Sequence, residues 1–147
     1  DELVFGNRLA TTIDGEQFVF YHYGPAHTSG DLVVYLPAYK FAFVGDLITS
    51  SVLVHPEKGG SFAGWFNNAR QLLKLDAVGY LGGHAKEPGT KESLRARIAN
   101  YRKVRDKVDD LIAQKQSFAE IKTAMGDPAR DPSGCRGIPY PSLARVE

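Results

Sequence analysis

The chain has 147 residues, of which 43% are hydrophobic and 24% charged, as in an ordinary folded protein with room for a hydrophobic core. Its 18 Lys and Arg residues nearly balance its 17 Asp and Glu residues, so a formal net charge of +1 gives no sign of a nucleic-acid-binding or membrane-binding surface. The single cysteine, Cys135, excludes a framework of intrachain disulfides and a cysteine-rich zinc module.

The first half of the chain predicts β-strands. Short runs rich in β-branched and aromatic residues cover residues 3–5, 9–13, 17–23, 32–36 and 40–44. Asp14-Gly15 predicts a hairpin turn, and Pro37-Ala38-Tyr39 predicts a tight connection between the last two runs. These last two runs are nearly continuous in apolar residues, which is typical of strands covered on both faces.

The second half changes to a helical period. An apolar stripe predicts a helix over residues 62–75, and residues 77–81 are expected to form a short buried strand. Thr90 is the expected N-cap of a long helix that ends near residue 114, and Ser117 with Glu120 predicts a capping box of a short final helix. We expect one domain over residues 1–147, with residues 128–147 as an extended proline-rich tail. The predicted fold class is α+β, a β-sheet covered by helices on one face, which leaves the other face without a partner.

Three side chains stand directly after predicted strands, each close to a glycine: His27, Asp46 and His84. Loops at strand ends are common places for site residues. Two imidazoles and one carboxylate are also a common ligand set of a catalytic zinc ion, which keeps one position open for water. A structural interpretation stays open for each residue, since Gly-Asp pairs are frequent in turns and a histidine after a strand is often a surface residue.

The sequence around these residues resembles the metallo-β-lactamase superfamily over roughly residues 17–113. The resemblance rests on Gly-Pro-Ala-His-Thr-Ser-Gly-Asp at 24–31, Val-Gly-Asp-Leu at 44–47 and Gly-Gly-His at 82–84. It implies an αββα fold, of which this chain would be the C-terminal half. It also implies one or two zinc ions, with His27 on the first metal, His84 on the second and Asp46 as the catalytic bridge. An aspartate at the bridge resembles the branch of glyoxalase II and the lactonases.

Two features depart from the family pattern. The signature His-x-His-x-Asp-His string is absent from the chain, and Ala85-Lys86 follows His84 where a glycine is usual. Without the string, each metal would keep one terminal ligand and the bridge. We therefore expect weak or absent zinc binding and little activity in the isolated chain. An exposed sheet face would favour a homodimer or pairing with the missing N-terminal half.

The resemblance implies a hydrolase of small esters, thioesters or lactams in the complete protein, with no nucleic-acid partner and no membrane span. The alternative is a non-catalytic half-fold module that associates through its sheet face, and a metal-free α/β domain is the third interpretation. Four further residues carry weaker expectations. Thr28 and Asp31 are expected to orient His27 or to cap the next strand, and His55 is expected on a loop at the site mouth. Trp65 is interpreted as a core residue.

Overall fold

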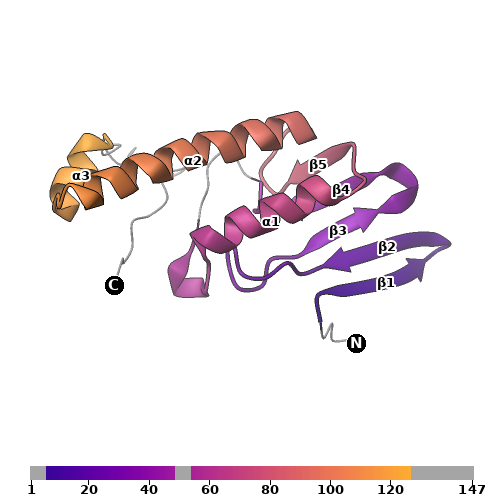
Figure 1. Ribbon diagram of the computed structural model, residues 1–147. Coiled ribbons are helices and arrows are strands. Elements are labelled where there is room, and N and C mark those ends of the chain that lie inside the picture. Colours follow the sequence, from indigo (N-terminus) through magenta and orange to yellow (C-terminus); the bar gives the residue numbers. More distant parts are fainter. Residues whose placement is uncertain (1–5, 49–53, 127–147) are drawn as a thin grey trace.

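The computed structural model describes residues 6–48 and 54–126. Within these residues, five strands form one sheet in the order β1-β2-β3-β4-β5 (Figure 1). The strands are β1 (Arg8–Ile13), β2 (Glu16–Tyr21), β3 (Val33–Leu36), β4 (Phe41–Gly45) and β5 (Gly79–Gly82). The first four pair in antiparallel fashion, whereas β4 and β5 are parallel. The chain therefore needs a crossover between β4 and β5, because parallel neighbours cannot be joined by a hairpin.

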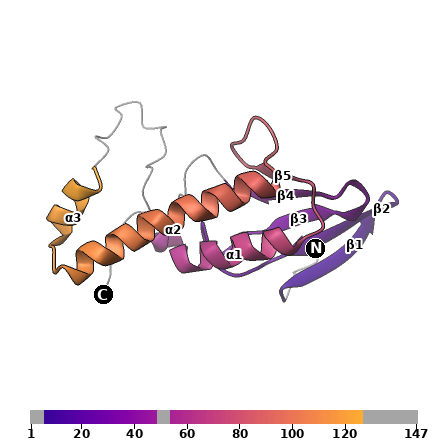
Figure 2. The same ribbon diagram turned by 45° about the horizontal axis from the view of Figure 1, so that its top comes forward.

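Helix α1 (Phe62–Lys74) provides this crossover, and α2 (Lys91–Ala113) follows β5. Figures 1 and 2 show α1 and α2 side by side over the same face of the sheet, with α3 (Phe118–Ala124) at the far end of α2. Two short 3₁₀ helices, η1 (Pro37–Tyr39) and η2 (Pro56–Lys58), lie in the connections. The predicted arrangement of helices on one face is confirmed.

Local sequence signals explain most of the boundaries. Asp14 and Gly15 form the β1–β2 turn, both with positive φ angles of 51° and 83°. The hydroxyls of Thr90 and Ser117 cap α2 and α3, and a capping box is present at each. The strand predicted over residues 17–23 ends at Tyr21, so His22 lies after the strand and not within it. Residues 3–5 and 128–147 lie outside the described residues, so the structure does not test the predicted first strand or the tail.

The main core lies between the sheet and the two long helices. Val19, Val33, Ala42, Val44 and Tyr80 point from the sheet into this layer and are buried. Buried residues of α1 and α2 complete it: Trp65, Phe66, Ala69, Leu72, Leu94, Ile98 and Tyr101. The prediction that Trp65 is a core residue is confirmed. A smaller cluster of Val108, Ile121 and Met125 joins α3 to the end of α2.

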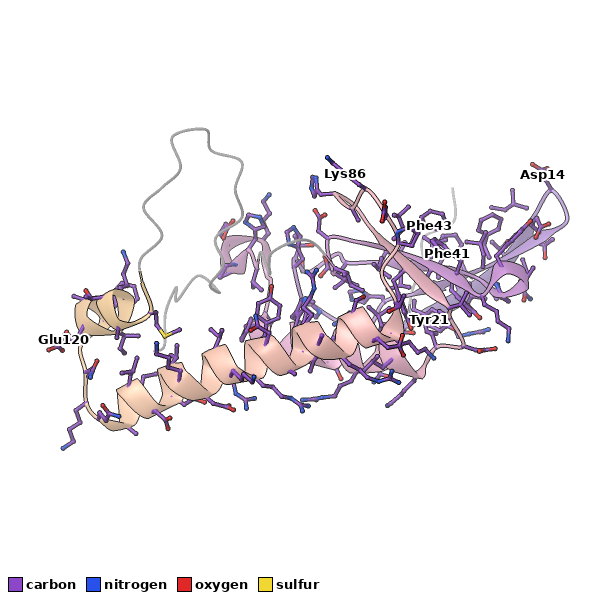
Figure 3. The ribbon with its side chains drawn as sticks, turned by 90° about the horizontal axis from the view of Figure 1, so that it is seen from above. Asp14, Tyr21, Phe41, Phe43, Lys86 and Glu120 are labelled. Carbon is purple, nitrogen blue, oxygen red and sulfur yellow. The ribbon has the colours of Figure 1, made fainter. Side chains whose placement is uncertain are left out.

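The other face of the sheet carries a continuous apolar row. Cross-strand pairing aligns one residue from each strand, in the order Leu9, Phe20, Val34, Phe43 and Leu81. Directly paired residues project from the same face. Phe43 is 44% exposed, and the other four residues of the row are not fully buried. The ring of Phe43 contacts that of Phe41 (Figure 3). In the described residues, this row has no layer packed upon it comparable to that on the helical face.

None of the described helices is long and apolar enough to cross a bilayer.

Candidate metal centre

The sheet topology brings the three predicted residues to one edge. Asp46 follows the end of β4 and His84 lies two residues beyond β5, and the ends of neighbouring parallel strands meet at the same edge of a sheet. His27 lies in the connection from β2 to the start of the antiparallel β3, which opens at that edge too. In Figure 3, Lys86 marks the loop that carries His84, and Asp14 marks the tip of the β1–β2 hairpin. The two loops lie well apart.

Asp46 lies between the two histidines. The Nε2 atom of His27 is 3.6 Å from Oδ2 of Asp46, and the Nε2 atom of His84 is 3.4 Å from Oδ1. Each imidazole therefore faces a different oxygen of the same carboxylate. Two atoms bound to one zinc ion at 2.0–2.1 Å in tetrahedral geometry are about 3.3–3.4 Å apart. Both pairs thus stand close to the separation of two ligands that share an ion.

The carboxylate of Asp46 is held with one oxygen buried. Oδ1 is buried and accepts no hydrogen bond within the described part of the chain, although burial of an unpaired polar atom is unfavourable. The backbone around it is tightly fixed, because Gly83 N donates to Gly45 O at 2.8 Å and Trp65 Nε1 donates to Leu47 O at 2.8 Å. A buried acceptor without a donor, close to an imidazole, suits a cation more than a structural role.

The His27 loop is closed by Asp31. Its carboxylate accepts hydrogen bonds from the backbone N–H of His27 at 2.6 Å and from the N–H and hydroxyl of Thr28 at 3.1–3.2 Å. The backbone carbonyl of Asp31 lies 2.8 Å from Nδ1 of His22. Asp31 therefore stabilises the turn that contains His27. His22, which lies after β2, contacts the same turn through the carbonyl of Asp31.

His55 packs directly on His27. The two imidazole rings meet edge to face, with their centroids 4.9 Å apart, and the N–H of His55 donates to the carbonyl of His27 at 2.9 Å. Nδ1 of His55 lies 2.7 Å from a carboxylate oxygen of Glu57. A hydrogen bond from the backbone N–H of Glu57 and then the contact with His55 hold the pKa of Glu57 below its usual value. His55 therefore packs next to His27, and its place at a site mouth stays a prediction.

Asn68 is a residue that the sequence patterns did not single out. It is 1% exposed, and its side chain reaches the carbonyls of Tyr23 and Gly24, which begin the His27 loop. A polar residue within the apolar stripe of α1, one turn after Trp65 and one turn before Leu72, is the signal that points to it. Buried amides of this kind normally have specific hydrogen-bond partners.

Among the described residues, the donors of this site form pairs and not a cluster. In the described residues, no group of three or more His, Cys, Asp or Glu side chains is arranged around a common point so that it would hold a metal ion. Asp46 instead forms two separate pairs, one with each histidine. Nitrogen from imidazole and oxygen from a carboxylate are donors that zinc accepts. The arrangement is therefore one carboxylate with an imidazole near each of its two oxygens.

Comparison with known proteins now identifies the class. The family model described as the metallo-beta-lactamase superfamily matches residues 3–84, more than half of the chain. The chain belongs to the metallo-beta-lactamase superfamily. Its mixed five-stranded sheet with helices is an α+β fold of that type, as predicted from the sequence. Membership supports a hydrolase, and members of the superfamily usually bind metal ions, often zinc.

Individual relatives share part of their length with this chain. It is 32% identical over 79 residues to the alpha subunit of 2,4-dinitroanisole O-demethylase from Nocardioides sp. (strain JS1661), which is 54% of this chain and 24% of the relative. A metallo-beta-lactamase from Pontibacter korlensis has a TM-score of 0.56 and 24% identity, over 65% of this chain and 46% of that one. A metallo-beta-lactamase family protein from Thermus thermophilus has a TM-score of 0.62 and 14% identity, over 86% and 44%.

The chain therefore spans less than half the length of these relatives. At these identities the two structures support the fold alone. Metal-ligand roles for His27, Asp46 and His84 stay predictions, which rest on their geometry and on the sequence context around them.

Proposed function

We propose that the protein to which this chain belongs is a metal-dependent hydrolase, with zinc as the preferred ion. His27 would hold one ion and His84 a second, and the carboxylate of Asp46 would contribute an oxygen to each. The observation that carries the proposal is that the two imidazoles face opposite oxygens of one carboxylate, 3.6 and 3.4 Å away. The buried Oδ1 of Asp46, which accepts no hydrogen bond from described residues, supports it.

The residues of this chain differ in what they contribute. The side chain of His27 is 11% exposed and its loop is tied down, so it provides a fixed nitrogen. The side chain of His84 is 77% exposed and borders solvent, which leaves room for substrate and water on that side. Bound metal would lower the pKa of a water molecule to near neutrality and would polarise the substrate oxygen.

This chain alone supplies too few ligands for a stable centre. Each proposed ion receives one imidazole nitrogen and one oxygen of Asp46, whereas a catalytic zinc ion generally has three protein ligands. We infer that the remaining ligands come from another segment of the same fold. The isolated chain is then expected to bind zinc only weakly and to be a poor catalyst.

The apolar row on the open sheet face supports the same conclusion. Exposed apolar patches of this kind mark interaction surfaces. We propose that a second β-sheet from the rest of the fold packs on Phe20, Val34 and Phe43. The chain aligns with 46% and 44% of two superfamily structures, which leaves more than half of each to supply that layer. A homodimer through this face is the competing outcome.

The substrate class follows from the proposed chemistry. A bound metal would supply an activated water and would polarise a carbonyl oxygen, which is the chemistry that hydrolysis of small esters, thioesters or lactams requires. A second candidate is an activated aryl methyl ether, because the relative that shares 32% identity over 79 residues is named as a 2,4-dinitroanisole O-demethylase subunit. A panel that contains both classes of substrate distinguishes them.

The test compares aspartates at opposite places in the fold. In the full protein that contains this chain, Asp46→Ala should abolish both hydrolysis and stoichiometric zinc binding, measured by metal analysis and competition titration. The control is Asp76→Ala, which removes an exposed carboxylate that pairs with Lys40 instead of a histidine. An Asp46→Ala protein that keeps its zinc and its activity would refute the proposal. Tight binding of two zinc ions by the isolated chain would refute the shared centre.

A further inference from the structure

The carbonyl groups that lead to His27 are held in succession by the segment over residues 55–68. The carbonyl of Tyr23 accepts from Nδ2 of Asn67 at 3.1 Å, and that of Gly24 accepts from Nδ2 of Asn68 at 3.1 Å. Ala26 O accepts from the N–H of Ser61 at 2.8 Å, and His27 O accepts from the N–H of His55 at 2.9 Å. The loop is thus fixed to the start of α1 and to the turn before it.

Asn68 is the buried member of this set. Its Nδ2 atom lies 2.9 Å from the carbonyl of Gly64, 3.1 Å from that of Gly24 and 3.5 Å from that of Tyr23. Its Oδ1 atom is buried and accepts no hydrogen bond from any described residue. An amide in this place costs stability compared with an apolar side chain unless its donor is used. The Nδ2 atom of Asn68 donates to a carbonyl of the helix and to carbonyls of the His27 loop.

The helix also touches the loop without any intervening side chain. A β-carbon built on Gly64 would lie 1.8 Å from the carbonyl oxygen of Pro25, so only glycine permits this approach. One turn of α1, from Gly64 to Asn68, therefore contacts the backbone of residues 23–25 and supports it. The position of His27, two residues further on, depends on this support because the loop has no strand of its own.

We propose that Asn68 is a positioning residue that sets the place of the His27 imidazole through the backbone of residues 23–26. This inference rests on the proposed function, in which His27 is a metal ligand. Residues that orient a metal ligand from outside commonly change metal affinity by about 10–100-fold when they are replaced. Asn68 contacts neither the imidazole nor the proposed metal in the described contacts, and acts only through the loop.

The test compares Asn68 with a core residue on the same helix. Asn68→Asp keeps the size of the side chain but replaces the donor that faces three carbonyls with an acceptor, and Asn68→Ala is the milder variant if that protein does not fold. Leu72→Ala is the control, because Leu72 is 1% exposed, one turn further along α1, and packs in the core. Two quantities are measured in the full protein: zinc affinity by competition titration, and amide hydrogen exchange of residues 26–31 without metal.

The expected result is a loss of zinc affinity of about 10–100-fold in the Asn68 variants. Exchange of the amides over residues 26–31 should accelerate in the same variants. Leu72→Ala should lower the unfolding midpoint but change zinc affinity less than about threefold, because a core cavity acts on global stability. Equal effects of the Asn68 and Leu72 variants on both quantities would overturn the inference. If Asp46→Ala binds zinc as well as the wild type, the proposed function fails, and the exchange of residues 26–31 still decides the role of Asn68.

Discussion

Gly83 and Asp46 are packed so closely that a β-carbon built on Gly83 would lie 2.7 Å from Oδ1 of Asp46. Real β-carbons do not approach another atom so closely, and the carboxylate of Asp46 has little room because its Oδ1 is buried. Gly83 therefore leaves the space in which the proposed bridging carboxylate stands. The same glycine donates its N–H to Gly45 and joins the ends of β4 and β5.

Gly83→Ala should displace the carboxylate of Asp46 and lower zinc affinity by roughly tenfold or more. The fold should persist, since Gly83 is exposed and lies after the end of β5. Competition titration and thermal unfolding measure the two effects. Gly30→Ala is a suitable control because its added methyl group would meet no atom within 4 Å. Equal zinc affinities of the two variants would show that Asp46 has freedom to move.

Replacement of either proposed terminal ligand should remove metal binding, but only the replacement of His27 should lower the free energy of unfolding substantially. His84→Ala should change the free energy of unfolding by no more than about 0.5 kcal/mol, because its side chain is 77% exposed. His27→Ala should cost roughly 1–3 kcal/mol, because the ring is buried and packs against His55. Both variants should lose zinc and activity. Urea unfolding in the presence of a chelator provides the stability measurement, and a destabilised His84→Ala protein would contradict the assignment.

A charged side chain on the open sheet face should disrupt the proposed packing of a second sheet. Phe43→Lys places an ammonium group at the centre of the apolar row, which should prevent a second sheet from packing there. In the isolated chain the free energy of unfolding should change by less than about 1 kcal/mol, since Phe43 is already 44% exposed.

Light scattering of the isolated chain and solubility of the full protein measure this effect. Val78→Lys is the matched control, because Val78 is 66% exposed and lies outside the strands. If Phe43→Lys leaves the full protein as soluble as Val78→Lys does, the row is not an internal interface.

Alkaline pH should destabilise the fold through Tyr80. Burial raises the pKa of Tyr80 from 10.0 to about 12, and its hydroxyl donates to the carbonyl of Leu72 at 2.8 Å. The unfolded chain ionises this group near pH 10 whereas the folded chain keeps the proton. The stability due to the raised pKa is therefore fully present below pH 10 and is lost as the pH rises towards 12.

Tyr80→Phe should cost about 1 kcal/mol at pH 8 through the lost hydrogen bond. It should also reduce the fall in stability between pH 8 and pH 11, because the ionisable group is gone. Urea unfolding at both pH values gives the comparison. Parallel losses in the wild type and in Tyr80→Phe would assign the alkaline effect to other groups, with Tyr23 as the next candidate because burial also raises its pKa.

Local patterns in the sequence were enough to predict most of the elements. The apolar stripe of α1, the cap at Thr90 and the turn at Asp14-Gly15 are decided by neighbours a few residues apart, and the structure agrees with each. The end of β2 was misplaced by two residues because Tyr21, His22 and Tyr23 continue a strand-like composition. There the chain instead turns to place His22 on the backbone of Asp31, a contact nine residues away.

The positions of His27, Asp46 and His84 after strands, together with the family resemblance, predicted these three residues as metal ligands, and that assignment stays a prediction. How they meet depends on the packing of the whole fold. The parallel pairing of β4 and β5 turns one oxygen of Asp46 towards each imidazole, and the packing of α1 sets Asn68 under the loop of His27. Such relations join residues roughly twenty to forty positions apart. They depend on the path of the backbone in space, which no local pattern of side chains encodes.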